Sequence, residues 1–89
     1  MLILKLGNRA RRFLAKLPPK HFGQIDTKMA MLRGNPFPQD SKFVKGTMYY
    51  RVDSGEYRIV YGVVGNVLDI PLIGKRNDDE VYKKLKRMG

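Results

Sequence analysis

The first third of the chain passes from a short apolar run to helical periodicity. Leu2-Ile3-Leu4 is short and β-prone, and the Gly7-Asn8 pair closes it. Asn8 is placed to cap a helix by accepting hydrogen bonds from the free N–H groups of the first turn. The apolar residues that follow recur at helical spacing and share one face: Ala10, Phe13, Leu14 and Leu17. This pattern predicts a strand followed by an amphipathic helix.

Prolines and a glycine delimit a second helix. Pro18-Pro19 must end the first helix, and Pro19 can open the next because proline is tolerated in the first helical turn. The apolar positions of this helix follow at steps of three and four: Phe22, Ile25, Met29 and Leu32. Gly34 is a natural C-terminal cap, and residues 35–42, with two prolines, are typical of a connecting loop. We expect the two helices to form a hairpin ahead of a sheet.

From Gly46 onward the hydrophobic period changes to two, which is typical of strands. A two-residue hairpin turn at Ser54-Gly55 would place Arg51 directly across from Arg58 on the solvent face. Asp53 and Glu56 are the carboxylates that could relieve the repulsion between these like charges. The opposite, core face then carries six apolar or aromatic residues: Met48, Tyr50, Val52, Tyr57, Ile59 and Tyr61.

A second hairpin turn at Gly65-Asn66 adds another strand, with Leu68, Ile70 and Leu72 on the core face. Pro71 predicts that this strand lies at the sheet edge, because proline cannot donate a ladder hydrogen bond. Asn77 and Glu80 form a capping box for a last helix. The predicted fold is α+β in the order β-α-α-β-β-β-α. It consists of an antiparallel sheet packed against a two-helix hairpin and a C-terminal helix, in one domain over residues 1–89.

Composition narrows the possible functions. The 89 residues include 18 Lys and Arg against 8 Asp and Glu, which gives a net charge of +10 and a field that attracts polyanions such as nucleic acid or an acidic protein. The absence of Cys excludes disulfides and thiol chemistry, and with His21 as the one histidine we expect no metal site and no cofactor. No apolar run is long enough for a membrane span or a signal-peptide core, so we expect a cytoplasmic protein.

The residues that could carry chemistry are arginines and tyrosines. RNA brings its own nucleophile, the 2′-OH, so positioning, charge stabilisation and proton transfer suffice to cleave it. Arg51 and Arg58 form a two-pronged anion site, and Arg76 could converge on the same phosphate. Neighbouring cations lower the pKa of a tyrosine, which makes Tyr82 a candidate proton acceptor. The alternative interpretation is a solvated sheet face with local ion pairs and a packing role for Tyr82.

Further basic residues are candidates for contact with RNA. Tyr49, on the solvent face, could stack on a base, although an exposed strand tyrosine needs no such role. The basic stripe of the first helix is equally well explained by solubility. The candidates for binding RNA or the ribosome, besides Tyr49, are Lys45, Arg9, Arg12, Lys16, Lys83, Lys84 and Lys86.

Two segments resemble the C-terminal half of the RelE/ParE toxin superfamily. They are YRVDSGEYRIVY at residues 50–61 and GKRNDDEVY at residues 74–82, and Asn35-Pro36 and Lys45-Gly46 resemble the loop and strand start of the same superfamily. RelE-like members are ribosome-dependent endoribonucleases that cut mRNA in the A site, whereas ParE-like members inhibit DNA gyrase and lack the catalytic set. The combination of Arg76 and Tyr82 favours the RNase branch.

The resemblance also implies roles for individual residues. Arg58 matches the arginine that stabilises charge on the phosphate, Arg76 the arginine that assists the leaving group, and Tyr82 the tyrosine that activates the 2′-OH. Arg51 stands where the family has its first basic residue on the second strand. Asp53 stands where RelE-like enzymes often carry a second lysine. A carboxylate there would repel the scissile phosphate, and Lys45 is the candidate to compensate.

The resemblance implies partners as well. A RelE-like toxin has a cognate acidic antitoxin and acts on mRNA at the small ribosomal subunit, where its basic surface would dock ribosomal RNA. The protein would be the toxin of a type II toxin-antitoxin system that inhibits translation. Two alternatives stay open: a ParE-like inhibitor of DNA gyrase, and a non-catalytic RNA-binding module or degenerate toxin.

Overall fold

The computed structural model describes residues 1–77, which form two helices and a five-stranded sheet. The order of the strands in the sheet is β1-β5-β4-β3-β2. The α+β class and the helix hairpin predicted from the sequence are confirmed, while the predicted last helix falls on residues 78–89, outside the described part. The elements are β1 (Ile3–Leu6), α1 (Asn8–Ala15), α2 (Pro19–Gly34), β2 (Lys42–Phe43), β3 (Tyr50–Ser54), β4 (Tyr57–Val64) and β5 (Val67–Lys75).

The sheet is mixed rather than antiparallel throughout. β3, β4 and β5 pair antiparallel as predicted, but β1 runs parallel to β5, with Ile3 opposite Val67 and Leu6 opposite Ile70. No hairpin turn joins β1 to its neighbour, so turn chemistry does not set its direction. β2 pairs with β3 at the other edge, in a segment that we expected to be loop. The predicted antiparallel pairing of the last three strands is therefore confirmed, and β1 and β2 extend this sheet at its two edges.

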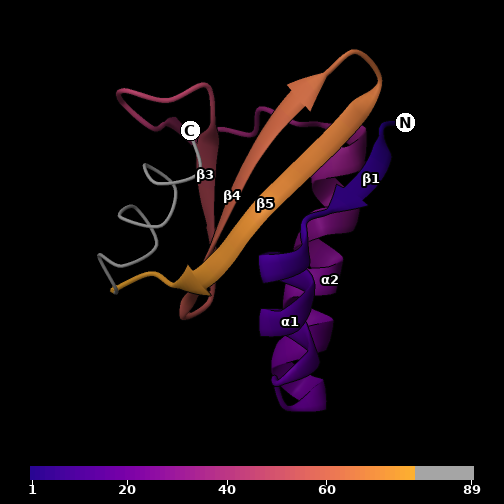
Figure 1. Cartoon of the computed structure of the whole chain (residues 1–89), viewed down its shortest axis with the longest axis vertical. Helices are drawn as coiled ribbons and strands as arrows, with labels where there is room; N and C mark the ends of the chain where they lie inside the picture. Colours follow the sequence, from indigo (N-terminus) through magenta and orange to yellow (C-terminus); the bar gives the residue numbers. More distant parts are fainter. Residues whose placement is uncertain (78–89) are drawn as a thin grey trace.

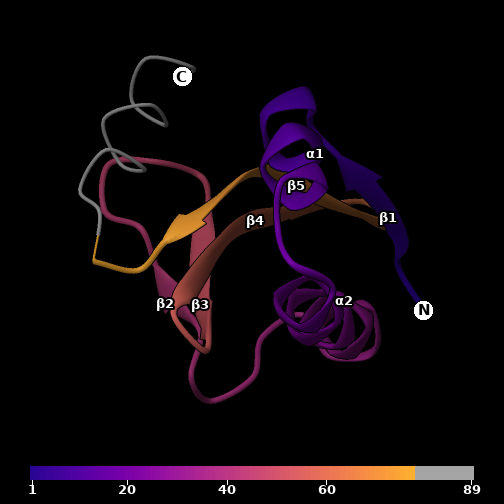
Figure 2. The ribbon, with the colours of Figure 1, turned by 90° about the horizontal axis from the view of Figure 1, so that it is seen from below.

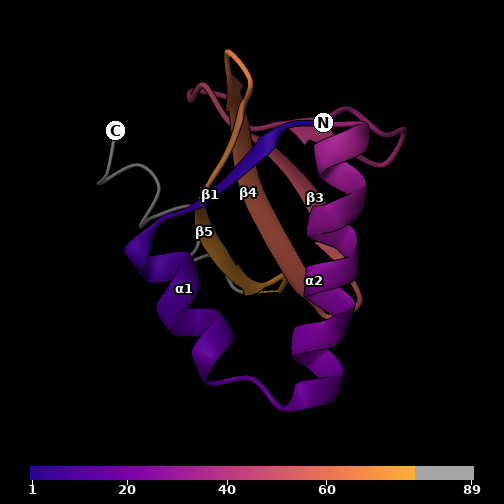
Figure 3. The same ribbon diagram turned by 90° about the vertical axis from the view of Figure 1, so that its right-hand side faces the viewer.

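Both helices pack on one face of the sheet (Figures 1 and 3). Seen from below, β2 and β3 lie on the side away from β1, in keeping with their position in the sheet (Figure 2). Between the helices and the strands lies one apolar core. Its fully buried members are Ala10, Ile25, Leu32, Ile59, Tyr61, Leu68 and Ile70, each with 0% of its surface exposed.

The ends of the helices follow the sequence with two exceptions. Pro19 opens α2 as the sequence predicts, but Gly34 is the last helical residue and Asn35 takes the predicted C-cap position. α1 begins at Asn8, so Gly7 occupies the N-cap position and no side chain caps the helix. A Cβ atom on Gly7 would lie 3.2 Å from Cα of Pro71, which explains why a residue without a side chain stands there. The predicted capping role of Asn8 is wrong.

The hairpin between β3 and β4 is shifted from the predicted register. Ser54 lies opposite Tyr57 and Asp53 opposite Arg58, so the two turn residues are Gly55 and Glu56. Gly55 has a φ of 59°, a conformation that suits glycine at the first central position of a tight hairpin turn. A shift by two residues preserves the faces of the strands, and Val52, Tyr57, Ile59 and Tyr61 are buried as predicted. Met48, however, precedes β3 and is 65% exposed, so its core assignment is wrong.

The same shift changes which charges meet across the strands. Arg51 lies opposite Val60, and Arg58 lies opposite Asp53. The predicted cross-strand pair of Arg51 and Arg58 is therefore wrong, and each arginine has a different partner. The repulsion that the sequence led us to expect is replaced by an opposite-charge pair, which is favourable between directly opposed residues.

A β-bulge interrupts the pairing of β4 with β5. Gly62 lies opposite Asp69, but Val60 lies opposite Leu72, so Ile70 and Pro71 both face the single residue Tyr61. An extra residue reverses the alternation of side chains beyond it. Ile73 consequently enters the core beside the helices.

Two predictions fail because of this bulge. Leu72 lies with Val44 and Val60 in a second, small apolar cluster on the opposite face, not in the core beside the helices. Pro71 does not mark an edge strand, because β5 lies between β1 and β4. Proline is tolerated at a bulge, and β1 pairs with β5 only at residues 67–70, before Pro71 is reached.

Removing the Tyr61 hydroxyl tests the buried connection between β4 and the loop after α2. Tyr61 is fully buried, and its hydroxyl donates a hydrogen bond of 2.6 Å to the carbonyl oxygen of Pro36. We expect Tyr61→Phe to lower the free energy of unfolding by about 1 to 2 kcal/mol, because the carbonyl oxygen of Pro36 loses the donor that the buried Tyr61 supplies. Urea denaturation at neutral pH measures the change. The half-buried Tyr49 supplies a control, since Tyr49→Phe should have a smaller effect.

Tyr61→Phe should also change how the free energy of unfolding falls at alkaline pH. Burial raises the pKa of the Tyr61 phenol above its ordinary value of 10.0. The stability linked to this proton is fully present below the pKa of the unfolded chain and is lost as the pH rises through the folded value. Tyr61→Phe should therefore lose less stability than the wild type above pH 10. Equal losses in both proteins would contradict this interpretation.

Candidate functional site

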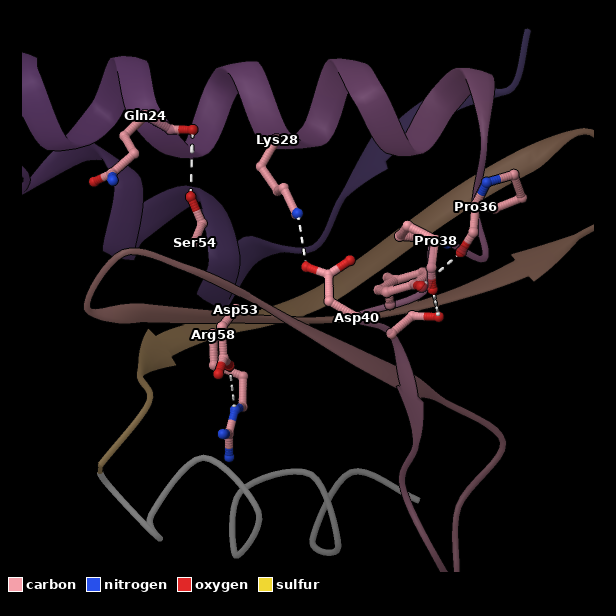
Figure 4. Close-up of polar contacts among 10 residues, drawn as sticks. Gln24, Lys28, Pro36, Pro38, Asp40, Asp53, Ser54 and Arg58 are labelled. Atoms are coloured by element: carbon pink, nitrogen blue, oxygen red, sulfur yellow. Dashed lines mark hydrogen bonds and ion pairs between the residues drawn. The ribbon is translucent and has the colours of Figure 1, made fainter.

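The sheet face turned away from the helices carries an ion pair close to the β3–β4 turn. Arg58 Nε lies 2.8 Å from Asp53 Oδ1, and the two residues are directly opposed on β4 and β3. Figure 4 shows Ser54 turned toward Gln24 of α2, while Asp53 and Arg58 lie on the other side of the sheet. Strand alternation thus separates the side that packs on the helices from the side that bears the charges.

Two more arginines belong to this face. Arg51 precedes Asp53 by two residues on β3 and so shares its face. Beyond the bulge, Leu72, Gly74 and Arg76 alternate onto the same side as Val60 and Arg58. The backbone N–H of Arg76 donates a hydrogen bond of 2.9 Å to the carbonyl oxygen of Glu56, which anchors the end of β5 to the β3–β4 turn.

The positive charges of Arg51, Arg58 and Arg76 all influence the pKa of Asp53. The hydrogen bond from Arg58 is the largest influence holding the pKa of Asp53 below its ordinary value, and the partial burial of Asp53 opposes it. The positive charges of Arg58, Arg51 and Arg76 lower this pKa further, in that order. Three of the four predicted catalytic residues therefore influence a single carboxylate: Arg58 by direct contact, and Arg51 and Arg76 by their charge. The fourth, Tyr82, lies outside the described residues.

An apolar patch lies beside the charged cluster. It consists of Val44, Val60 and Leu72, with Tyr49 packed against it. The Tyr49 ring lies over Gly62, where a Cβ atom would be 3.2 Å from Tyr49 Cδ1. Tyr49 is therefore a half-buried packing residue of this face, and a role in stacking on a base stays a prediction.

Lys42 is a cation of this face that sequence reasoning missed. It lies directly opposite Arg51 in the pairing of β2 with β3, so the two side chains share a face. The two prolines between residues 35 and 42 predicted a loop, and the edge strand that places Lys42 is only two residues long. The available signal was the β-prone pair Phe43-Val44, which follows Lys42 directly. Lys45 itself is exposed in the turn between β2 and β3.

The remaining predicted RNA contacts are not part of this cluster. Arg9, Arg12 and Lys16 are exposed along α1, whose buried residues pack on the opposite face of the sheet from Arg58. The described residues thus carry two separate basic surfaces. Lys83, Lys84 and Lys86 lie outside the described part of the chain.

Residues 1–77 offer no group of three or more acidic, histidine or cysteine side chains that could hold a metal ion. His21 Nδ1 shares a hydrogen bond of 2.5 Å with the hydroxyl of Tyr57, which joins α2 to β4.

Neither helix of this part of the chain has the length and apolar character needed to cross a membrane. The chemistry that residues 1–77 offer at this face is the binding of an anion by arginine.

Comparison with solved structures identifies the fold. The toxin RelE of E. coli, as a double arginine-to-alanine mutant in the free state, is similar at a TM-score of 0.81 and 26% identity, over 99% of this chain and 98% of that one. The archaeal RelE–RelB complex of Pyrococcus horikoshii gives a TM-score of 0.75 and 25% identity, over 85% and 96% of the chains. The intact E. coli RelBE toxin–antitoxin complex gives 0.76 and 23%, over 88% and 100%.

The sequence itself matches no protein-family model and no curated protein. The architecture is nevertheless that of a small toxin fold, with a helix pair on one sheet face and arginines on the other. The structural likeness to the RelE toxin at 26% identity supports the RelE-like toxin superfamily, which the resemblance of the sequence predicted. This likeness supports a toxin role and a protein antitoxin as partner.

The arrangement of arginines around Asp53 can be tested by titration. We expect Arg58→Gln to raise the pKa of Asp53 toward its ordinary value, because both a hydrogen bond and a positive charge are lost. Arg51→Gln and Arg76→Gln should raise this pKa less, since each contributes only a charge. NMR titration of the Asp53 carboxyl carbon measures all three shifts. Asp40, whose pKa is lowered by Lys28, serves as an internal control and should not change.

Proposed function

We propose that this protein is the toxin of a type II toxin-antitoxin system and cleaves mRNA on the translating ribosome. The observation that carries the proposal is the grouping of Arg51, Arg58 and Arg76 on one sheet face, where the charge of each lowers the pKa of Asp53. A cluster of guanidinium groups suits a phosphate, because each group can donate two parallel hydrogen bonds to its oxygens. The RelE-like fold supports the choice of RNA as the polyanion.

The proposed reaction uses the 2′-OH of the RNA as nucleophile. The 2′ oxygen forms a bond to the adjacent phosphorus, and the bond from phosphorus to the 5′ oxygen of the next nucleotide breaks. Arg51 and Arg58 hold the non-bridging oxygens and stabilise the charge that develops on them. Arg76 assists the departing 5′ oxygen, and Tyr82 accepts the proton of the 2′-OH. The products are a 2′,3′-cyclic phosphate or 3′-phosphate and a 5′-OH, without metal or cofactor.

The basic surfaces serve docking in this proposal. Arg9, Arg12 and Lys16 on α1, together with Lys45 and the lysines at positions 83, 84 and 86, contact ribosomal RNA of the small subunit. The position of α1 across the sheet from the arginines lets one surface bind the ribosome while the other faces mRNA. An acidic antitoxin neutralises the net charge of +10 and covers the arginines. Action on mRNA places the protein in the cytoplasm.

The ion pair between Asp53 and Arg58 favours a second candidate function. A carboxylate on the proposed phosphate-binding arginine would oppose cleavage, so a non-catalytic RNA-binding module is the alternative. It predicts salt-dependent binding of RNA without any cut.

Mapping of new 5′ ends on a reporter mRNA tests the catalytic proposal. The protein is induced in a bacterial translation system, and primer extension compares the wild type with Arg76→Ala and Tyr82→Phe. We expect cuts in register with the reading frame that vanish when translation is blocked and fall at least about tenfold in both variants. Lys75→Ala is the matched control, because strand alternation directs this neighbouring cation to the other face, and it should cut like the wild type.

The contrary outcomes of this experiment are distinct. Growth arrest without cuts, unchanged in Arg76→Ala and Tyr82→Phe, would contradict the nuclease and lead to a gyrase supercoiling assay for a ParE-like activity. RNA binding without either cuts or arrest would support the non-catalytic module instead.

Docking through α1 predicts a specific salt dependence. We expect the triple variant Arg9→Ala, Arg12→Ala, Lys16→Ala to bind ribosomes more weakly and to reduce the slope of log affinity against log salt by about two, because fewer counterions are released. Sedimentation with ribosomes at several salt concentrations measures both effects. An unchanged slope would assign these residues to solubility alone.

A further inference from the structure

We propose that Asp53 is an internal counter-anion that competes with the RNA phosphate for Arg58 and so limits the affinity of the site for its substrate. This inference rests on the proposed function, because it concerns the phosphate that the three arginines would bind. It assigns a role to the residue that departs from the basic pattern of the site.

The backbone fixes the carboxylate in this position. Asp53 and Arg58 are directly opposed across the β3–β4 hairpin, one residue pair away from its turn. Their contact of 2.8 Å joins Oδ1 to Nε. Because cross-strand neighbours remain adjacent in every rotamer, Asp53 stays within reach of Arg58 as long as the hairpin pairs.

Exposure makes the carboxylate a competitor for ligands from solution. The Asp53 side chain is 40% exposed, whereas that of Arg58 is 15% exposed. An incoming phosphate can therefore reach the carboxylate and either displace it or bind beside a like charge. A carboxylate oxygen and a non-bridging phosphate oxygen accept the same charge-assisted hydrogen bond from a guanidinium, so both compete for one donor.

The charge of Asp53 also weakens the attraction of the three arginines, Arg51, Arg58 and Arg76, for a phosphate. Asp53 feels Arg51 and Arg76 as well as Arg58, so one negative charge offsets part of the field of all three. A substrate phosphate meets a weaker field than the arginines alone would produce. Removing the charge of Asp53 should tighten phosphate binding by about tenfold, which lies between the effect of one unit charge at this range in bulk water and its larger effect near a protein surface.

A purely structural role for Asp53, in which it only orients Arg58, leads to different predictions. If Asp53 only orients Arg58, then Asp53→Asn should bind RNA as well as the wild type, because the amide oxygen can still accept from Nε. Asp53→Ala should bind more weakly, since the orienting group is lost. If Asp53 competes, both variants should bind more tightly than the wild type.

The experiment measures binding of a fluorescent single-stranded oligoribonucleotide with 2′-O-methyl sugars, which has no free 2′-OH and cannot be cut. Fluorescence anisotropy at several salt concentrations gives the affinity for the wild type, Asp53→Asn and Asp53→Ala. We expect about tenfold tighter binding in both variants and a steeper salt dependence, because one more cation is available to replace counterions. Circular dichroism melting verifies that each variant is folded.

Asp40→Asn is the matched control. It makes the same change in net charge and breaks another ion pair of residues 1–77, that of Lys28 with Asp40 at 2.9 Å. Figure 4 shows this pair between α2 and the loop that follows it, away from Arg58. Its affinity should stay within about twofold of the wild type. An equal gain in Asp40→Asn would assign the effect to net charge and overturn the inference.

The inference and the proposed function can fail separately. Tighter binding in both Asp53 variants, with no mRNA cuts from any protein, would support the counter-anion and reject the nuclease. Ribosome-dependent cuts by the wild type, with unchanged or weaker RNA binding in both Asp53 variants, would support the nuclease and overturn the counter-anion.

Discussion

The pairing of β4 with β5 through a bulge is the constraint on which the charged site depends. In an uninterrupted ladder, Leu68, Ile70, Leu72 and Gly74 would all point to one face, and Arg76 would follow them toward the helices. Because Ile70 and Pro71 together face Tyr61, the alternation reverses and Arg76 comes to the side of Arg58. The bulge thus completes the arginine cluster and at the same time keeps an arginine away from the apolar core, where an unpaired charge would be strongly destabilising.

The two faces of the sheet have different roles: one buries the apolar core and the other carries the charged residues. The face beside α1 and α2 buries the larger apolar core, and this burial supplies most of the driving force for folding. Among residues 1–77, the other face has only the small cluster of Val44, Val60 and Leu72, with Tyr49 packed against it. A face with so little apolar area can carry several like charges only if they are solvated or partly neutralised. The ion pair of Asp53 with Arg58 provides that neutralisation within the hairpin itself.

Much of this arrangement could be predicted from the sequence, and the failures have physical reasons. Proline and helical periodicity located both helices, and strand alternation assigned Val52, Ile59 and Tyr61 to the core. The hairpin turn moved by one residue and the pairing register by two, which left these faces intact but exchanged the partner of Arg58, because alternation specifies a face and not an opposing residue. The bulge at Pro71 could not be found from periodicity. Leu72 and Ile73 are both apolar, so the sequence does not show which of the two faces the core, and tertiary packing decides it. The parallel direction of β1 likewise depends on packing between distant segments.

The position of Asp53 links stability and function through one charge. Without a ligand, three arginines on one small surface repel one another, and the carboxylate reduces this repulsion. A bound phosphate would supply the same relief, so ligand and carboxylate are alternatives for the same electrostatic need. A site that needs its own counter-ion in the free state must give up part of that interaction when an anion binds. The register of the β3–β4 hairpin, which brings Asp53 opposite Arg58, therefore sets both the stability of the free site and the free energy left over for binding.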